Sequence, residues 1–240
     1  MGKTTDSTGT LYLIPTTLGD NEPLEVLPIS IKQAIERIDH YIVENEKSAR
    51  RFIKKISSGK SQPGLRISVL NKFTEAEEMP SFLKPCQEGH DIGILSEAGC
   101  PGVADPGAEV IRIAHEKGIR VAPLVGPSSI IMALMASGMN GQNFAFTGYL
   151  PIDSRERKNA IKNLEKISRD TGQSQLFMET PYRNDGLLDE LAKVLRPNTR
   201  LCVACDITMH SEYIATKTAA QWKKTKVELH RRPAIFIVHG

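Results

Sequence analysis

The chain has 240 residues, of which 40% are hydrophobic and 25% charged, and its formal net charge is +3 at pH 7. This composition is typical of a globular protein with one large domain or two small ones, and the weak positive charge permits a polyanionic partner without requiring one. No apolar stretch is long enough to span a bilayer, and the polar residues 1–9 are unlike a secretory signal, so we expect a disordered leader, no membrane contact and a cytoplasmic protein.

The first half alternates short apolar runs with helical patterns, which predicts an α/β domain with a mainly parallel sheet over residues 10–124. Strands are predicted at 10–15, 40–44, 65–70, 91–96 and 119–124. Helices are predicted at 29–38, 46–57, 74–83 and 106–117, the third of them broken or kinked by Pro80.

The second half, residues 125–240, has more strands for each helix, which predicts a second α/β domain with a mixed sheet. Strands are predicted at 144–148, 175–179, 200–205, 213–218 and 234–239. Helices are predicted at 130–137, 154–169 and 184–195. The domain boundary therefore falls between Leu124 and Val125.

Cys202 and Cys205 have the spacing of a metal-ligand pair, but the chain has no second such pair. They lie in a run that reads as a buried strand, where a free cysteine acts as a small hydrophobic residue. We therefore predict no metal site.

The segment 96–107 follows a predicted strand and precedes a predicted helix, at the edge where open α/β sheets bind ligands. Its glycines, among them Gly99, let a backbone approach a ligand closely, while Pro101 and Pro106 stiffen the loop. Backbone N–H groups at the start of the helix are suited to bind a carboxylate. A tight structural turn explains the glycine and proline content equally well.

Five blocks, in order along the chain, resemble the tetrapyrrole-methylase superfamily, and within it the branch that methylates a ribose 2′-oxygen of small-subunit (16S) ribosomal RNA. They are Leu11-Tyr-Leu-Ile-Pro-Thr-Thr17, the segment 96–107, Val125-Gly-Pro-Ser-Ser-Ile-Ile-Met-Ala-Leu134 with Ala136-Ser-Gly138, Phe146-Thr-Gly-Tyr-Leu-Pro151 and Glu179-Thr-Pro-Tyr-Arg183. The resemblance implies two α/β domains, an S-adenosylmethionine cleft between them, and a homodimer.

The resemblance also implies which residues bind the cofactor. Carried over position by position, they are Pro15, Ser96, Glu97, Ala98, Gly99, Val103, Ala104, Asp105, Ser128, Ser129, Met178, Pro233 and Ala234. Some have structural alternatives, since Ser128 is equally suited to cap a helix and Met178 to fill a core.

Methyl transfer to a ribose hydroxyl needs a base, and the candidates are Glu44, Glu97, Asp105 and Glu179. We predict Glu44, which takes the place of the glutamate in the family's Ala-Glu-Asp-Thr-Arg block, although the block here reads Val43-Glu-Asn-Glu-Lys-Ser-Ala-Arg50. A second departure lies at 206–212, where Thr208 and Glu212 match the ribosomal branch but its lysine is absent.

Predicted substrate contacts are Arg50, Arg155, Arg157, Arg183 and Thr208. Basic clusters, such as Arg155 with Arg157 and Lys158, are suited to bind RNA phosphates or to form a solvated face. The sequence thus predicts a methyltransferase acting on a ribose 2′-hydroxyl of small-subunit ribosomal RNA. Two alternatives stay open, namely methylation of a tetrapyrrole or other small molecule, and a cofactor-binding module without catalysis.

Overall fold

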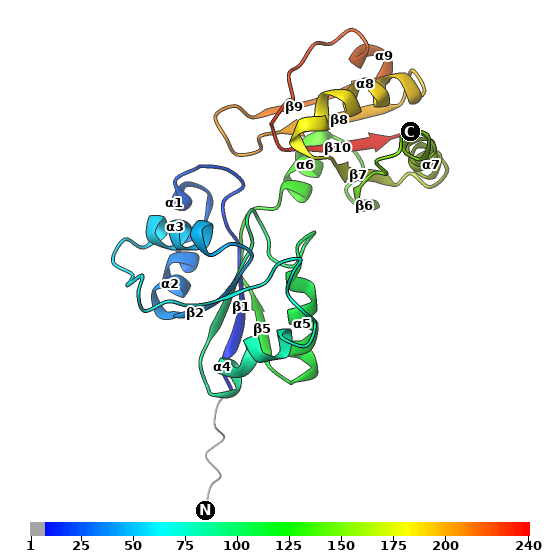
Figure 1. Ribbon diagram of the computed structural model, residues 1–240. Coiled ribbons are helices and arrows are strands. Elements are labelled where there is room, and N and C mark those ends of the chain that lie inside the picture. Colours follow the sequence, from blue (N-terminus) through cyan, green and yellow to red (C-terminus); the bar gives the residue numbers. More distant parts are fainter. Residues whose placement is uncertain (1–7) are drawn as a thin grey trace, which may run out of the picture. The chain divides into compact units, whose positions relative to one another are not determined.

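The computed structural model describes residues 8–240 and divides into two compact units, one ending at Pro127 and one from Ser128 to Gly240 (Figure 1). Residues 1–7 of the predicted leader lie outside the described residues, whereas the backbone N–H of Gly9 donates a 2.8 Å hydrogen bond to the carbonyl of Cys86. The domain boundary at 124/125 stays a prediction, which expression of the two halves alone would test.

The first unit contains a parallel sheet, which confirms the predicted sheet type, and its strand order is β3-β2-β4-β1-β5. Its strands are β1 (Thr10–Ile14), β2 (His40–Val43), β3 (Arg66–Val69), β4 (Ile92–Leu95) and β5 (Arg120–Pro123). Its helices are α1 (Pro23–Val26), α2 (Ile29–Arg37), α3 (Glu46–Ile56), α4 (Lys84–Gln87) and α5 (Gly107–Glu116), and a 3-10 helix, η1, spans Met79–Leu83.

Both faces of this sheet are covered, which explains why β2 is apolar throughout. Tyr41 and Val43 share a buried cluster with Ile53 of α3, whereas Ile42, between them in sequence, packs in the cluster that contains Val110 of α5. Figure 1 accordingly shows α2 and α3 on one side of the sheet and α4 and α5 on the other.

The helix predicted at 74–83 is wrong in its first half. Residues 74 and 75 belong to no regular element, residues 76–78 form a turn, and the helical segment begins only at Met79. Pro80 therefore occupies the first turn of η1, where its missing N–H has no intrahelical partner to lose.

The second unit contains a mixed sheet, which confirms the second predicted sheet type, and its strand order is β6-β7-β10-β8-β9. Its strands are β6 (Phe144–Tyr149), β7 (Ser174–Met178), β8 (Arg200–Cys205), β9 (Tyr213–Thr218) and β10 (Ala234–His239). In the described chain, β6 and β7 pair in parallel and the other neighbouring strands of this sheet pair antiparallel. Its helices are α6 (Ser129–Ser137), α7 (Ser154–Thr171), α8 (Asn184–Val194) and α9 (Ala219–Trp222), with the 3-10 helix η2 at Pro181–Arg183.

The core of the second unit lies where α7 and α8 pack on one face of this sheet. Leu164 of α7 and Leu191 of α8 share a buried cluster with Phe177 and Phe236, whose rings stack 6.0 Å apart on neighbouring strands. The same cluster contains Trp222, which is 3% exposed and donates its indole N–H to the carbonyl of Leu201.

Cys202 and Cys205 occupy β8 and are fully buried. Cys205 belongs to the cluster that faces α7 and α8, and because side chains alternate along a strand, Cys202 points to the opposite face. Burial raises the pKa of both thiols. The two sulfurs therefore do not face a common ligand, and within residues 8–240 no group of His, Cys, Asp or Glu is arranged to bind a metal.

Candidate functional site

The carboxyl ends of β1, β2 and β4 lie side by side, because Ile14 and Val43 both pair with Leu95. The residues that follow these strands, Pro15, Glu44 and Ser96, therefore meet at one edge of the sheet. Such an edge is where open α/β sheets bind ligands.

The segment 96–107 is bonded to the loop after β1. The backbone N–H of Thr16 donates to the carbonyl of Gly99 at 3.0 Å, and the Thr16 hydroxyl donates to the carbonyl of Ser96 at 3.3 Å. The hydroxyl of Ser96 also donates to the Gly99 carbonyl, at 2.8 Å. These bonds fix the two loops relative to each other.

The backbone of this segment enters the left-handed region at Gly99, with φ +74°, and again at Gly102 and Ala104. A Cβ on Gly99 would lie 3.0 Å from Cδ2 of Leu18 and 3.2 Å from the carbonyl oxygen of Pro127. Glycine is therefore required at position 99 both by conformation and by the approach of a second backbone.

A second glycine, Gly126, was not singled out from the sequence as a site residue. Its missing side chain makes room for Pro15, because a Cβ on Gly126 would lie 2.2 Å from Cβ of Pro15. Pro15 is buried, so this contact sets the position of the loop after β1.

Three carboxylates gather at the edge of the first sheet, namely Glu44, Glu97 and Asp105. Burial, then the charges of Asp105 and Glu97, raises the pKa of Glu44, while a hydrogen bond from the Glu97 backbone N–H lowers it. Burial and the charge of Glu97 also raise the pKa of Asp105. Glu97 itself accepts a 2.6 Å hydrogen bond from the Ser48 hydroxyl.

Glu44 and Asp105 line one small pocket, and each has a buried oxygen, Oε1 and Oδ2 respectively, that has no hydrogen-bond partner. The remaining lining residues are apolar or belong to the loop: Ile42, Val43, Leu70, Ile94, Leu95, Ser96, Pro101, Gly102, Pro106 and Gly107. Buried polar atoms are nearly always bonded, so these two acceptors are available to a ligand.

Of the other residues predicted to bind the cofactor in the first unit, Ala98 and Val103 lie exposed on the loop, Val103 with 49% of its surface accessible. Ala104 is also exposed. The structure thus brings together the first-unit part of the predicted set, at the carboxyl ends of the strands.

In the second unit, the predicted residues form two groups. Ser128 caps α6, accepting a 3.4 Å hydrogen bond from the N–H of Ile131, and Ser129 is the first residue of that helix. Met178 ends β7 beside the start of β10, where it pairs with Ile235, next to Pro233 and Ala234. The cap gives Ser128 a structural role, and the binding roles of these five residues stay predictions.

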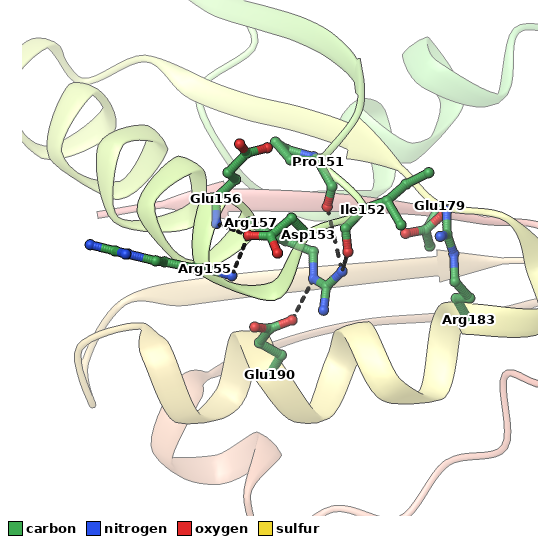
Figure 2. Close-up of polar contacts among 9 residues, drawn as sticks. All are labelled: Pro151, Ile152, Asp153, Arg155, Glu156, Arg157, Glu179, Arg183 and Glu190. Carbon is green, nitrogen blue, oxygen red and sulfur yellow. Dashed lines mark hydrogen bonds and ion pairs between the residues drawn. The ribbon is translucent and has the colours of Figure 1, made fainter.

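The predicted substrate residues are mostly engaged in ion pairs (Figure 2). Arg157 on α7 points to Glu190 on α8, with Nε 2.5 Å from Oε2, and also donates to the carbonyl of Ile152 at 2.8 Å. Arg183 lies 2.6 Å from Glu179, whose side chain is 2% exposed.

Arg155 differs from its neighbour Arg157. Its side chain is exposed and extends away from the Arg157 pair in Figure 2, although its backbone N–H donates to the capping residue Asp153. In the first unit, Arg50 pairs with Glu46 at 2.7 Å and donates to the carbonyl of Gln62.

Thr208 lies in the turn at 206–212, with φ +74°, and its N–H donates to Glu212. Sequence reasoning missed Arg232, which holds this turn. Its Nε lies 2.7 Å from Oδ2 of Asp206, and its Nη2 donates to the carbonyl of Ser211. The 21 or more residues that separate these partners leave no local pattern from which to predict the contact.

None of the helices within residues 8–240 combines the length and apolar character needed to cross a membrane. Figure 1 shows both units as layered α/β folds, and solved structures share this fold. The structure of the methyltransferase CobJ aligns with a TM-score of 0.64 at 15% identity, and the alignment covers 97% of this chain and 95% of CobJ. Cobalt precorrin-4 methyltransferase, CbiF, aligns with a TM-score of 0.62, also at 15% identity, over 100% of this chain and 97% of its own.

Curated relatives align over almost the whole sequence. Ribosomal RNA small subunit methyltransferase I of Escherichia coli O157:H7 is 28% identical over 98% of this chain and 79% of its own length. The protein of the same name from Haemophilus influenzae is 28% identical over 98% of this chain and 80% of its own. A family model described as Tetrapyrrole (Corrin/Porphyrin) Methylases matches residues 10–222. The chain therefore belongs to the Tetrapyrrole (Corrin/Porphyrin) Methylases and is a methyltransferase, which confirms the resemblance seen in the sequence.

Proposed function

We propose that the protein transfers a methyl group from S-adenosylmethionine to a ribose 2′-hydroxyl of small-subunit ribosomal RNA. The observation that carries the substrate is the alignment of the two named ribosomal RNA methyltransferases along 98% of the chain. The precorrin enzyme is only 15% identical and supports the fold alone.

The carboxyl edge of the first sheet fits a cofactor that carries positive charge. S-adenosylmethionine would supply a methyl group on a cationic sulfonium, together with an ammonium group. The partnerless oxygens of Glu44 and Asp105 are suited to accept a hydrogen bond from such an ammonium group. We propose that Pro15, Ser96, Glu97, Ala98, Gly99, Val103, Ala104 and Asp105 bind it from the first unit.

The remaining binding residues are also proposals. We propose that Ser128, Ser129, Met178, Pro233 and Ala234 bind the cofactor from the second unit. The thioether of Met178 and the ring of Pro233 offer apolar surface for an adenine, and the serine hydroxyls offer polar contacts.

Glu44 is the proposed base. S-adenosylmethionine would supply the methyl group, and the hydroxyl that receives it would have to lose its proton, which Glu44 would accept. The raised pKa of Glu44 makes its carboxylate a better proton acceptor than an ordinary glutamate, as long as it is ionised at the working pH. Asp105 and Glu97 contribute by raising that pKa through their charges.

Arg50, Arg155, Arg183 and Thr208 stay proposed substrate contacts. Arg157 is kept with them as a proposal, although its guanidinium is committed to Glu190 and to backbone carbonyls. We further propose a homodimer, since apolar Met135 is 78% and Tyr149 58% exposed in the second unit, and a cytoplasmic location, where a ribosomal substrate is found.

A glutamate variant with a matched control tests the proposed base. Glu44→Gln should abolish methyl transfer to small ribosomal subunits and leave the protein folded, whereas Glu77→Gln, at an exposed residue outside the site, should transfer normally. Calorimetry should show S-adenosylmethionine binding to the wild-type protein. No binding would overturn the proposed function, and full activity of Glu44→Gln would overturn the base.

A further inference from the structure

A groove runs between α7 and α8 on the second unit. Its lining is mostly charged and comes from both helices, with Arg157, Lys158 and Lys162 on α7 and Asp189, Glu190 and Lys193 on α8. Gly186 leaves the α8 side open, since a Cβ there would meet nothing within 4 Å. Figure 2 shows how Arg157 reaches from α7 to Glu190 on α8, so that this pair ties the two walls together.

Three lysines of the groove are exposed and unpaired. Within residues 8–240, the ammonium groups of Lys158, Lys162 and Lys193 take part in no ion pair or hydrogen bond. By contrast, Lys166, one turn beyond Lys162 on the same helix, lies 2.8 Å from Asp170. The groove lysines thus differ from their neighbour in lacking a counter-charge.

Two carboxylates close to these lysines, Glu190 and Glu165, are already engaged. Oε2 of Glu190 bonds Arg157, and Glu165 accepts from the N–H of Arg196 and from the Thr199 hydroxyl. Asp189 is the remaining acid in the lining. With the Arg157–Glu190 pair neutral, three lysines face one aspartate, and the groove keeps an excess of positive charge.

The arrangement of the lysines also costs the helix stability. Lys158 and Lys162 stand four residues apart on α7, where like charges lie next to each other and repel. An anion bound between them would relieve this repulsion. Lysines are compact point charges on flexible stems, so an open groove of lysines suits a chain of phosphates better than a single planar carboxylate.

We propose that the groove between α7 and α8 binds the phosphodiester backbone of RNA through Lys158, Lys162 and Lys193. This assignment rests on the proposed function, since it names where the RNA substrate is held. Arg157 contributes to this groove through its pair with Glu190, which holds the two walls together. The contacts are to the backbone and therefore carry no base specificity.

The test compares two charge-matched triple variants. The groove variant is Lys158→Gln/Lys162→Gln/Lys193→Gln, and the control is Lys166→Gln/Lys223→Gln/Lys224→Gln, which removes the same charge from exposed positions of the same unit. Filter binding of a single-stranded 16S ribosomal RNA fragment is measured from low to high salt. S-adenosylmethionine affinity by calorimetry confirms that each variant is folded.

Each phosphate contact contributes about 0.7 to the slope of log affinity against log salt on a single strand. Three lost contacts should therefore flatten the slope by about 2. The ratio of wild-type to variant affinity should then be roughly 100 times larger at about 0.1 M salt than at about 1 M salt. The control should keep the wild-type slope. An unchanged slope in the groove variant, or an equal change in the control, would overturn the proposal.

Methyl transfer separates this result from the proposed function. A wild-type protein that methylates small subunits, with a groove variant that binds RNA normally, would refute the groove alone. A wild-type protein that binds RNA through the groove but methylates no RNA would refute the proposed function and leave the groove in place.

Discussion

Removing the ion pair between Arg157 of α7 and Glu190 of α8 should destabilise the second unit. Their side chains are 19% and 11% exposed, and the pair joins α7 to α8 over the core of the second unit. Among residues 8–240, Arg157 is the only hydrogen-bond partner of the Glu190 carboxylate, because it bonds Oε2 and Oε1 has no partner. Replacing Arg157 with Met would therefore leave this carboxylate unpaired. It would also free the carbonyl of Ile152.

Leaving one charge of a buried pair alone typically costs about 3–5 kcal/mol. Because both groups keep some solvent contact, we expect the lower end, about 3 kcal/mol. The double variant Arg157→Met/Glu190→Met buries no lone charge and should recover to within about 1 kcal/mol of the wild type.

Urea unfolding followed by tryptophan fluorescence is a suitable assay, because the single tryptophan, Trp222, is buried in the core of this same unit. With a slope of about 2 kcal/mol per molar urea, Arg157→Met should lower the midpoint by about 1.5 M. A midpoint that stays at the wild-type value, or a double variant no more stable than the single one, would refute the claim that the pair is structural.

Three further predictions concern the first sheet and the cysteines. Gly99→Val should destabilise the first unit by about 1–3 kcal/mol and abolish cofactor binding, because it places a β-branched residue at φ +74° against Leu18 and Pro127. The control Gly59→Val, in open space, should do neither. Urea unfolding measures the stability of both variants, and calorimetry measures their cofactor binding. The pKa of Glu44 is raised in the folded state, so the protonated Glu44 side chain contributes to stability at low pH. This contribution is lost as the pH rises from the ordinary glutamate pKa through the raised one. Glu44→Gln should therefore gain stability over the wild type as pH rises through that window, and a constant difference would count against the raised pKa. Buried Cys202 and Cys205, the latter with its pKa raised to about 11, should react with a thiol reagent at about pH 8 only after urea is added. Half-buried Cys100 can label earlier, so the labelled peptide is identified by mass, and rapid native labelling of the Cys202–Cys205 peptide would contradict the burial of these two thiols.

Periodicity was enough to predict the strands and the two sheet types, because both depend on local patterns of apolar residues. β2, for example, is apolar at Tyr41, Ile42 and Val43 since both of its faces are covered, and that pattern is visible in the sequence. The helix expected at 74–83 failed because loop geometry at 74–78 depends on side chains that the helical period does not describe, such as Thr74, whose hydroxyl accepts from the N–H of Asn71.

The position of the candidate site at one edge of the sheet could be predicted for the same reason. Glu44 and the segment 96–107 follow strands, so their meeting at one edge follows from a parallel sheet. The pairing of Arg157 with Glu190 depends on how α7 packs on α8, and a cluster of basic residues gave no indication that one member points inward. Gly126 was likewise hidden, because its role is to admit Pro15, more than a hundred residues earlier.

The central claim is methyl transfer to the small ribosomal subunit, and one measurement tests it directly. Purified protein is incubated with labelled S-adenosylmethionine and unmodified small subunits, and the RNA is then recovered. We expect label in 16S ribosomal RNA that is released by ribonuclease and lies in an alkali-resistant dinucleotide, as a 2′-O-methyl group requires. Label that is absent from the RNA, while the protein binds S-adenosylmethionine, would contradict it.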